Sequence, residues 1–493
     1  MNHAYLDALV AAPFATALLV MLVGRRSEGA GVGLAVLGSL VIFGWSIPAV
    51  LEDRAVDAVW IESLDVHWHL LLDGISAPLL LLTTLVTLCC QIALVRHAPD
   101  CGGRASLAAL LMLIESGVIG AFLAVDMVLF FLFFEVALIP MWFVINAWGD
   151  QHDPIGRRRA ATRFLVFTVL GSALMIVGFL IVKADSGTFD ITQVSSASTV
   201  AAVLVGIGLA VKTPLWPVHI WLPDAHAKAP TVGSVILAAL LLKLGTYGFI
   251  RFWLPLVDPA DDILPVFAGL AVVGIVYGAL ACLAQTDLKR LIAYSSVGHM
   301  GFVVLAITSY TTIGVQAAVY ASVAHGLITG LLFFAAGAIK DRYGTGDLAE
   351  LKALYGAVPR LAGVLAFAAM ASLGLPGLAG FWGEMLAIRS ALFAHDALPH
   401  DTFVVLSVIA ALGVILTSAY FLVMMRTLLQ GEPGPRGSSR DASEASQRVE
   451  TKADLHWLEW AAWSPLLVLT VVLGVAPGLL LDPVATAMTG VLR

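Results

Sequence analysis

The chain has 493 residues, of which 60% are hydrophobic and 12% charged, and its mean hydropathy is +0.94. Soluble domains are about 25% charged, so this composition excludes a water-soluble globule. The net charge is −7, whereas nucleic-acid-binding proteins present clusters of Lys and Arg, so nucleic-acid binding is not expected. The apolar segments are long and unbroken, which is typical of membrane helices and not of a transmembrane β-barrel. We therefore expect an all-α polytopic membrane protein.

A helix needs about 20 apolar residues to cross a bilayer. Apolar runs between charged or Pro/Gly-rich breaks predict about 14 such helices, in chain order at 4–23, 30–51, 73–95, 105–124, 126–147, 161–183, 197–222, 230–254, 263–284, 291–309, 313–338, 361–395, 402–428 and 460–482. A polar segment rich in Gly, Pro and Ser precedes the last of them and predicts a flexible cytoplasmic loop.

Two of the predicted helices contain clusters of Pro and Gly beside a charged residue. Pro214 and Pro217 follow Lys212, and Gly374 and Pro376 precede Glu384. Broken helices at corresponding places in two halves of a chain indicate an inverted repeat with ion sites near the membrane midplane. The expected regions are helices 1–3 (1–104), a first five-helix repeat (105–254), a second, inverted one (255–428), the loop (429–459) and helix 14 (460–493).

The basic residues are distributed unevenly between alternate loops. One set of loops carries 19 of the 27 Lys and Arg residues and the other set carries 5. Basic residues near helix ends are retained in the cytoplasm, so the richer set is predicted to be cytoplasmic. Both termini are then expected on the opposite side of the membrane.

Four charged residues lie in the middle of predicted spans: Glu135, Lys212, Lys243 and Glu384. A charge at that depth costs about 2.5–3.5 kcal/mol on insertion scales, and such residues mark ion paths by default. Two structural alternatives stay open. Glu135 and Lys212 could form a buried ion pair that transports nothing, and Lys243 could extend its side chain to the membrane interface.

Further titratable residues fall within or beside the spans. His299 and His325 are expected to relay protons between the two halves, with an ordinary core histidine as the alternative. Glu115 is a secondary candidate for proton translocation, with an internal hydrogen bond as its alternative. His219 and His226 are expected at the cytoplasmic surface.

The sequence offers no pattern for a bound cofactor or metal. The four cysteines make no C-x-x-C pair, so an iron–sulfur ligand set is not indicated. No second carboxylate or histidine lies at helical spacing beside Glu135 or Glu384, which argues against a metal site. We expect neither in this chain.

Several long motifs resemble one known family, the antiporter-like membrane subunits of proton-pumping NADH:quinone oxidoreductase (complex I), and within it the members called subunit M or chain 4. The resemblance covers nearly the whole chain. It is strongest in DGISAPLLLLTTL from Asp73, FFEVALIPMW from Phe133, VKTPLWPVHIWLPDAHAKAPTVGSVILAALLLKLGTYGFIRF from Val211, QTDLKRLIAYSSVGHMGF from Gln285 and GLPGLAGFWGEM from Gly374.

This resemblance implies roles for individual residues. It implies Glu135 and Lys212 as a charge-coupled pair, Lys243 as the central lysine, and Glu384 as an exit-side or coupling carboxylate. Related antiporter subunits generally have lysine where this chain has Glu384. Gly298 departs from the serine usual in the family, which weakens a polar relay beside His299.

The resemblance also implies the setting. It implies FMN, iron–sulfur clusters, NADH and quinone in partner subunits, neighbouring antiporter-like subunits L and N, and a bacterial inner membrane with both termini on the periplasmic side. The leading hypothesis is a proton-translocating subunit without redox catalysis of its own. The alternatives are a subunit of an Mrp-like cation/proton antiporter and a purely structural membrane spacer.

Overall fold

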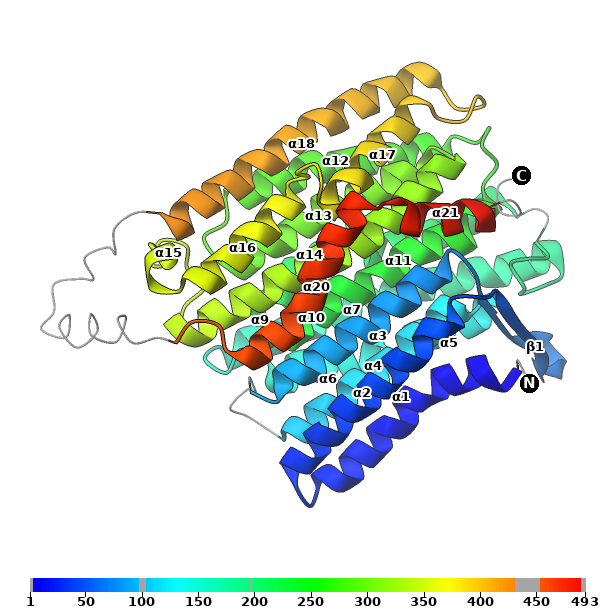
Figure 1. Ribbon diagram of the computed structural model, residues 1–493. Helices are drawn as coiled ribbons and strands as arrows, with labels where there is room; N and C mark the ends of the chain where they lie inside the picture. Colours follow the sequence, from blue (N-terminus) through cyan, green and yellow to red (C-terminus); the bar gives the residue numbers. More distant parts are fainter. Residues whose placement is uncertain (1–2, 97–102, 195–196, 431–452, 489–493) are drawn as a thin grey trace, which may run out of the picture.

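A computed structural model describes residues 3–96, 103–194, 197–430 and 453–488. The chain folds into a bundle of long, roughly parallel helices (Figure 1). Within these residues, 12 helices are long and apolar enough to cross a membrane. The other two predicted spans, 197–222 and 361–395, are each divided into shorter pieces. The all-α polytopic fold predicted from composition is confirmed.

The elements of the first half begin with two helices and a hairpin: α1 (His3–Gly24), α2 (Glu28–Ala49), β1 (Arg54–Ile61), the 3₁₀ turn η1 (Glu62–Leu64), β2 (Val66–Leu72) and α3 (Ser76–Leu94). Then follow α4 (Arg104–Leu123), α5 (Met127–Val136), α6 (Leu138–Trp148), α7 (Pro154–Ser186), α8 (Thr199–Lys212) and α9 (Leu222–Lys228). A continuous buried rod combines α10 (Thr231–Ile236), the π-helix η2 (Leu237–Leu241), α11 (Leu242–Gly248), the π-helix η3 (Phe249–Trp253) and the 3₁₀ turn η4 (Leu254–Leu256).

The second half contains α12 (Ile263–Leu283), α13 (Leu288–Thr308), α14 (Thr312–Tyr343), α15 (Leu354–Ala357), α16 (Pro359–Ser372), α17 (Ala379–Leu392), α18 (His400–Leu429), α20 (Trp457–Val475) and α21 (Gly478–Ala487). Figure 1 shows that α1 begins and α21 ends at the same end of the bundle. Of the predicted loop 429–459, residues 431–452 lie outside the described part of the chain. The predicted last span, 460–482, ends earlier, at Val475, before a separate α21.

Both predicted helix breaks are confirmed. α8 ends at Lys212, and the chain passes through Pro214, whose φ is +25°, before α9 begins. α16 and α17 are separated by residues 373–378, where Gly374 and Gly377 have φ of +79° and +91°. Side chains other than glycine rarely adopt these angles, so the two glycines permit the turn at this point. The inverted relationship between the two halves stays a prediction.

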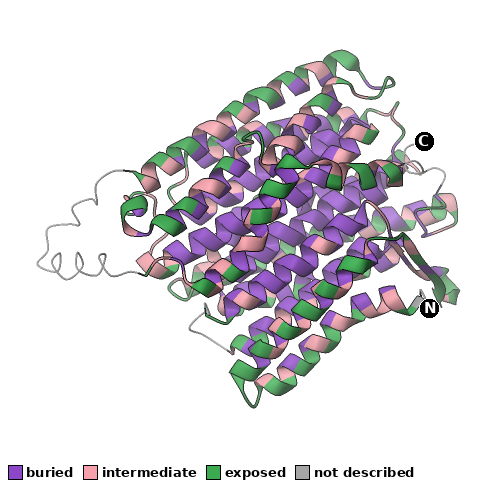
Figure 2. Cartoon of the chain, in the orientation of Figure 1, coloured by how far each residue is buried: buried purple, intermediate pink, exposed green. Residues whose placement is uncertain are grey.

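Burial separates an inner layer of helices from an outer one (Figure 2). The most apolar stretches of α14 and of the rod from α10 to η4 are completely buried inside the protein. That of α13 is 89% buried. In α1, α2 and α18 only 33%, 33% and 28% of the most apolar stretch is buried, as in helices that face lipid. The inner helices are the ones that carry Lys243, His299 and His325.

The hairpin of β1 and β2 was not predicted. It is antiparallel, with Arg54 opposite Leu72, and lies beside the bundle end where α1 begins (Figure 1). Isolated bridges join Leu70 to Ala124 and Asp126 to Asp190, so the hairpin is tied to two interhelical connections. The polar–apolar alternation of VHWHL is the signal that could have revealed the second strand.

Candidate functional site

Lys243 occupies the centre of the bundle. It is the second residue of α11, just after η2, and its side chain is fully buried. Its Nζ donates to the carbonyl oxygen of Ala238 at 2.5 Å and lies 2.6 Å from Nδ1 of His325 on α14. The alternative in which Lys243 extends to the interface is therefore wrong, because its nitrogen has both partners inside the protein.

His325 continues the polar row from Lys243 across α14. Its Nδ1 also lies 3.3 Å from Oγ1 of Thr329, one turn further along the helix. Its Nε2 is buried and has no hydrogen-bond partner within the described residues. The ring centroid is 5.6 Å from that of His299, with the two planes at 69°. The two histidines thus stand in edge contact, although no direct hydrogen bond joins them.

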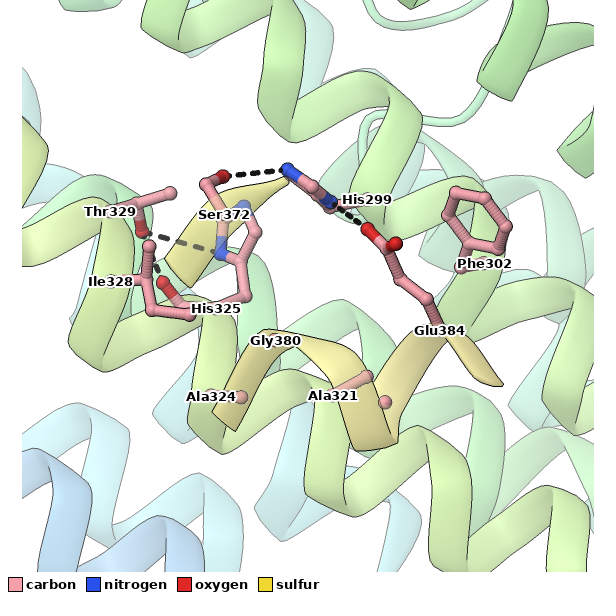
Figure 3. Close-up of a pocket in the computed structure, with 11 residues that line it drawn as sticks. His299, Phe302, Ala321, Ala324, His325, Ile328, Thr329, Ser372, Gly380 and Glu384 are labelled. Carbon is pink, nitrogen blue, oxygen red and sulfur yellow. Dashed lines mark hydrogen bonds and ion pairs between the residues drawn. The ribbon is translucent and has the colours of Figure 1, made fainter. Parts of the chain in front are cut away.

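His299 connects α13 to both parts of the broken helix (Figure 3). Its Nδ1 lies 3.1 Å from Oε1 of Glu384, near the start of α17, and its Nε2 lies 2.9 Å from Oγ of Ser372, the last residue of α16. Both ring nitrogens therefore contact polar groups. The absence of serine at Gly298 does not leave His299 isolated, because Ser372 supplies a hydroxyl from another helix.

A small cavity of about 30 Å³ lies among these side chains, lined by His299, His325, Ser372 and Glu384 together with apolar residues (Figure 3). A polar cavity of this size can hold a water molecule. Lys243, His325, His299 and Glu384 thus form one row, which we call the central row. Its members come from four helical segments that the sequence separates widely.

Lys212 and Glu135 lie apart from the central row. Lys212 is the last residue of α8 and is buried, and its Nζ lies 4.6 Å from the ring centroid of Phe134. Glu135, on α5, is half-buried. The charge of Glu135 acts on Lys212, but the two side chains form no direct ion pair. The alternative of a buried structural ion pair is therefore wrong.

Glu115 is fully buried on α4, and both of its carboxylate oxygens have no hydrogen-bond partner in the described part of the chain. The alternative of an internal hydrogen bond is therefore wrong. Residues seven apart share a helix face, so Glu115 lies on the same face of α4 as Ala108 and Phe122. This face contacts other helices: the carbonyl oxygen of Ala108 accepts a hydrogen bond from Gln91, and the ring of Phe122 contacts that of Tyr247. It points into the bundle rather than toward lipid.

The expectation that His219 and His226 lie at the surface is wrong. Both are buried, and His226 stacks on Phe333 with ring centroids 4.5 Å apart. Two distant helices, α7 and α13, pack against α9, and Phe333 of α14 covers His226, which the sequence could not reveal. The charges of Lys243 and Lys289 both act on His226. This histidine is therefore near enough to both Lys243 and Lys289 to be affected by their charges.

Lys289 lines a larger polar cavity of about 480 Å³, which sequence reasoning missed. Asp150, in the connection before α7, also lines it and forms ion pairs with Lys228 at 3.4 Å and Lys340 at 3.3 Å. Burial raises the pKa of Asp150, but the positive charges of Lys340 and Lys228 outweigh this effect. The pKa of Asp150 is therefore below its usual value. No local pattern predicts this cluster, because Asp150 lies in the connection before α7 whereas Lys228, Lys289 and Lys340 belong to α9, α13 and α14.

A second polar cluster lies at the opposite end, on the hairpin. Nδ1 of His69 is 3.0 Å from Oδ2 of Asp190. The hydrogen bond to Asp190 raises the pKa of His69. Burial raises the pKa of Asp190, but hydrogen bonds from His69 and Thr192 outweigh it and hold that pKa at about 2.

No cluster of three His, Cys, Asp or Glu side chains is placed to hold a metal ion among residues 3–96, 103–194, 197–430 and 453–488. Cys89, Cys90 and Cys282 are buried free thiols, and Cys101 lies outside the described residues. Four titratable groups, those of the central row, instead follow one another in contact.

Residues 124–418 match the model of the family described as "NADH:quinone oxidoreductase/Mrp antiporter, TM". The chain belongs to this family. The matched residues include the whole central row and the Glu135–Lys212 region, whereas Glu115 lies before them.

Curated relatives agree with the family match. The chain is 39% identical over 452 residues to NADH-quinone oxidoreductase subunit M of Rhodobacter capsulatus, covering 88% of this chain and 82% of the relative. It is also 39% identical over 448 residues to subunit M of Pseudomonas aeruginosa, covering 88% and 84%.

Solved structures show the same fold. A chain of respiratory complex I from Thermus thermophilus with bound NADH superposes with a TM-score of 0.84 at 29% identity, covering 99% of this chain and all of the other. A chain of the Mrp complex from Dietzia sp. superposes with a TM-score of 0.83 at 24% identity, covering 99% and 98%. The second likeness shows the fold alone.

Proposed function

We propose that this chain is a proton-translocating membrane-arm subunit of an NADH:quinone oxidoreductase. Electron transfer from NADH to quinone takes place in other subunits and drives proton movement through this one. The observation that carries the proposal is the central row, in which each titratable group contacts the next. Relatives named subunit M, 39% identical over most of the chain, support the assignment to this enzyme.

The central row contains the groups that proton transfer requires. Nζ of Lys243 lies 2.6 Å from Nδ1 of His325, which is within the heavy-atom distance at which a proton passes between positioned groups. His325 and His299 are in ring contact, and the cavity beside them can hold a bridging water. His299 then lies 3.1 Å from Glu384, which is the acceptor at the end of the row.

Coupling begins at the other broken helix. Lys212 lies at the carboxyl end of α8, where the helix dipole favours its positive charge. Glu135 acts on Lys212 without direct contact, so a small movement of α5 changes the field at Lys212. We propose that this pair sets the proton affinity of Lys243, with His226 linking the central row to Lys289 and the larger cavity. Glu115 has a secondary part in the same transfer.

The proposal includes the surroundings of the chain. FMN, iron–sulfur clusters, NADH and quinone belong to partner subunits, and this chain performs no redox step itself. Its neighbours are the antiporter-like subunits L and N within a bacterial inner membrane. Both termini lie on the periplasmic side, since the cytoplasmic loops carry most of the basic residues.

A subunit of an Mrp-like multisubunit antiporter is the second candidate. The superposition on the Mrp complex from Dietzia sp. favours it as far as the fold is concerned. The two candidates differ in their energy source, which is redox chemistry in one and ion exchange in the other. Purification of the tagged chain from its native membrane separates them, because only the first brings down flavin and iron–sulfur subunits.

The test of proton translocation is Glu384→Gln in the assembled complex. Glutamine keeps the size of the side chain and can accept from His299, but it cannot take up a proton. We expect normal assembly on a native gel, with NADH-driven proton uptake and quinone reduction both strongly reduced. Undiminished proton uptake in the assembled variant would contradict the proposal and favour the alternative in which the chain is a purely structural membrane spacer.

Glu459→Gln is the matched control for this variant. Glu459 is also a buried glutamate, and it pairs with Arg342 at 2.8 Å away from the central row. Arg342 keeps the carbonyl oxygens of Ala338, Ala453 and Asp454 as acceptors after the change. Glu459 also lines the larger cavity, so this variant controls for the loss of a buried glutamate charge on assembly, and we expect it to assemble as the wild type does.

A further inference from the structure

A basic groove of about 870 Å³ lies at the start of α7, outside the central row. Four arginines line it, Arg157, Arg158, Arg159 and Arg163, and no carboxylate does. Thr162 adds a hydroxyl to the same wall. The groove therefore presents hydrogen-bond donors and positive charge without a counter-charge of its own.

Most of this charge is uncompensated. Arg163 pairs with Asp224, but Arg157, Arg158 and Arg159 form no ion pair with any described residue. Nε and Nη1 of Arg157 are buried and have no hydrogen-bond partner there. Buried N–H groups without acceptors destabilise a fold, so an acceptor from outside the described residues would stabilise this place. The planar guanidinium matches the oxygen atoms of a phosphate group.

An apolar surface continues from the groove along the same helix. Val166 lines the groove and is 57% exposed, and Val169 and Leu170 follow it with 44% and 59% exposed. Apolar side chains exposed on a membrane-spanning helix are covered by acyl chains. The arginines thus lie at the level of the lipid headgroups and the valines at the level of the chains. A free anion would contact only the arginines, whereas a phospholipid would contact the arginines with its headgroup and the apolar side chains with an acyl chain.

We propose that this groove binds an anionic phospholipid of the cytoplasmic leaflet. Arg157 and Arg158 hold the headgroup phosphate, and one acyl chain lies along Val166 and Leu170. Basic pockets beside transmembrane helices on the cytoplasmic side are a common form of such sites. The site is separate from proton transfer, so it stands whether or not the central row moves protons.

The test uses the detergent-solubilised complex titrated with short-chain phosphatidylglycerol and measured by native mass spectrometry. The variant is Arg157→Ala with Arg158→Ala. Each basic residue at such a surface contributes about fivefold to affinity, so the half-saturating lipid concentration is expected to rise about 25-fold. Arg25→Ala with Arg26→Ala is the matched control, since it removes two exposed arginines from the α1–α2 turn. Its half-saturation should be that of the wild type.

Inorganic phosphate distinguishes a lipid from a free anion. We expect millimolar phosphate to leave the bound phosphatidylglycerol in place, because it makes no apolar contact. Displacement by phosphate, or equal half-saturation in the wild type and both variants, would overturn the proposal. So would loss of a neighbouring subunit from the Arg157/Arg158 variant on a native gel with lipid binding unchanged, since the groove would then be a protein contact.

Discussion

Lys243 is the residue whose replacement tests the central row most directly. Lys243→Met keeps an unbranched side chain but removes the Nζ that joins Ala238 to His325. Thr329 stays within 3.3 Å of His325 and so keeps one polar contact to that ring. The change therefore interrupts the row at one atom and leaves its other members in place.

The expected cost to the fold is small. The carbonyl oxygen of Ala238 and Nδ1 of His325 lose a donor, which costs about 1–3 kcal/mol for each buried group. Removal of a fully buried ammonium group relieves a desolvation penalty of several kcal/mol. These contributions oppose each other, so we expect a net change within about 2 kcal/mol and a normally assembled complex. Proton transfer through a positioned side chain contributes about 10²–10⁴-fold, so transfer along the row should fall at least about 100-fold.

The assay combines a native gel with NADH-driven quinone reduction and proton uptake by inverted membrane vesicles. Leu240→Met is the control, because Leu240 is equally buried three residues earlier and such a replacement costs less than about 1.5 kcal/mol. The control should pump as the wild type does. If the assembled Lys243→Met complex pumps at the wild-type rate, the central row is not the proton path.

Three further outcomes follow from the geometry. Glu135→Gln should leave the complex assembled on a native gel but lower quinone reduction and proton uptake together, because Lys212 loses the charge that acts on it; normal uptake would remove Glu135 from the mechanism. Asp73→Ala should destabilise the chain by about 3–5 kcal/mol in thermal unfolding, since it leaves buried Arg251 without the carboxylate that it contacts at 2.6 Å; a smaller loss would mean that Arg251 finds another acceptor. The contact between His69 and Asp190 should protect the hairpin from hydrogen exchange above about pH 4, the unfolded pKa of Asp. Protection is lost as the pH falls through the Asp190 pKa of about 2, and as it rises through the raised pKa of His69; the His69→Ala variant should show no such dependence.

The transmembrane helices could be predicted because one physical requirement dominates them. A chain in lipid must satisfy its backbone groups internally, so long apolar runs become helices whatever their neighbours are. The breaks after Lys212 and before Glu384 were predictable too, since proline and glycine act on their own backbone. The hairpin of β1 and β2 was missed, because residues 52–72 mix polar and apolar side chains and lie between two predicted spans.

The candidate site could be predicted only as a set of residue types. A charge in a long apolar run is visible in the sequence, and this identified Lys243 and Glu384. Their partners were not visible, since 82 residues separate Lys243 from His325 and the contacts depend on how α11, α13, α14 and α17 pack. The same packing buries His226, which local polarity had placed at the surface.

The sequence by itself determined that the chain lies in a membrane, where its long apolar helices run, which two are broken and which charges and histidines lie within the spans. These properties depend on the cost of transferring each segment from water to lipid, and that cost depends on local composition. The tertiary structure alone decided that four of these groups form one row and that Glu135 stands off from Lys212. Hydrogen bonds and ion pairs require atoms within about 3 Å of each other, and only the packing of distant helices brings them that close.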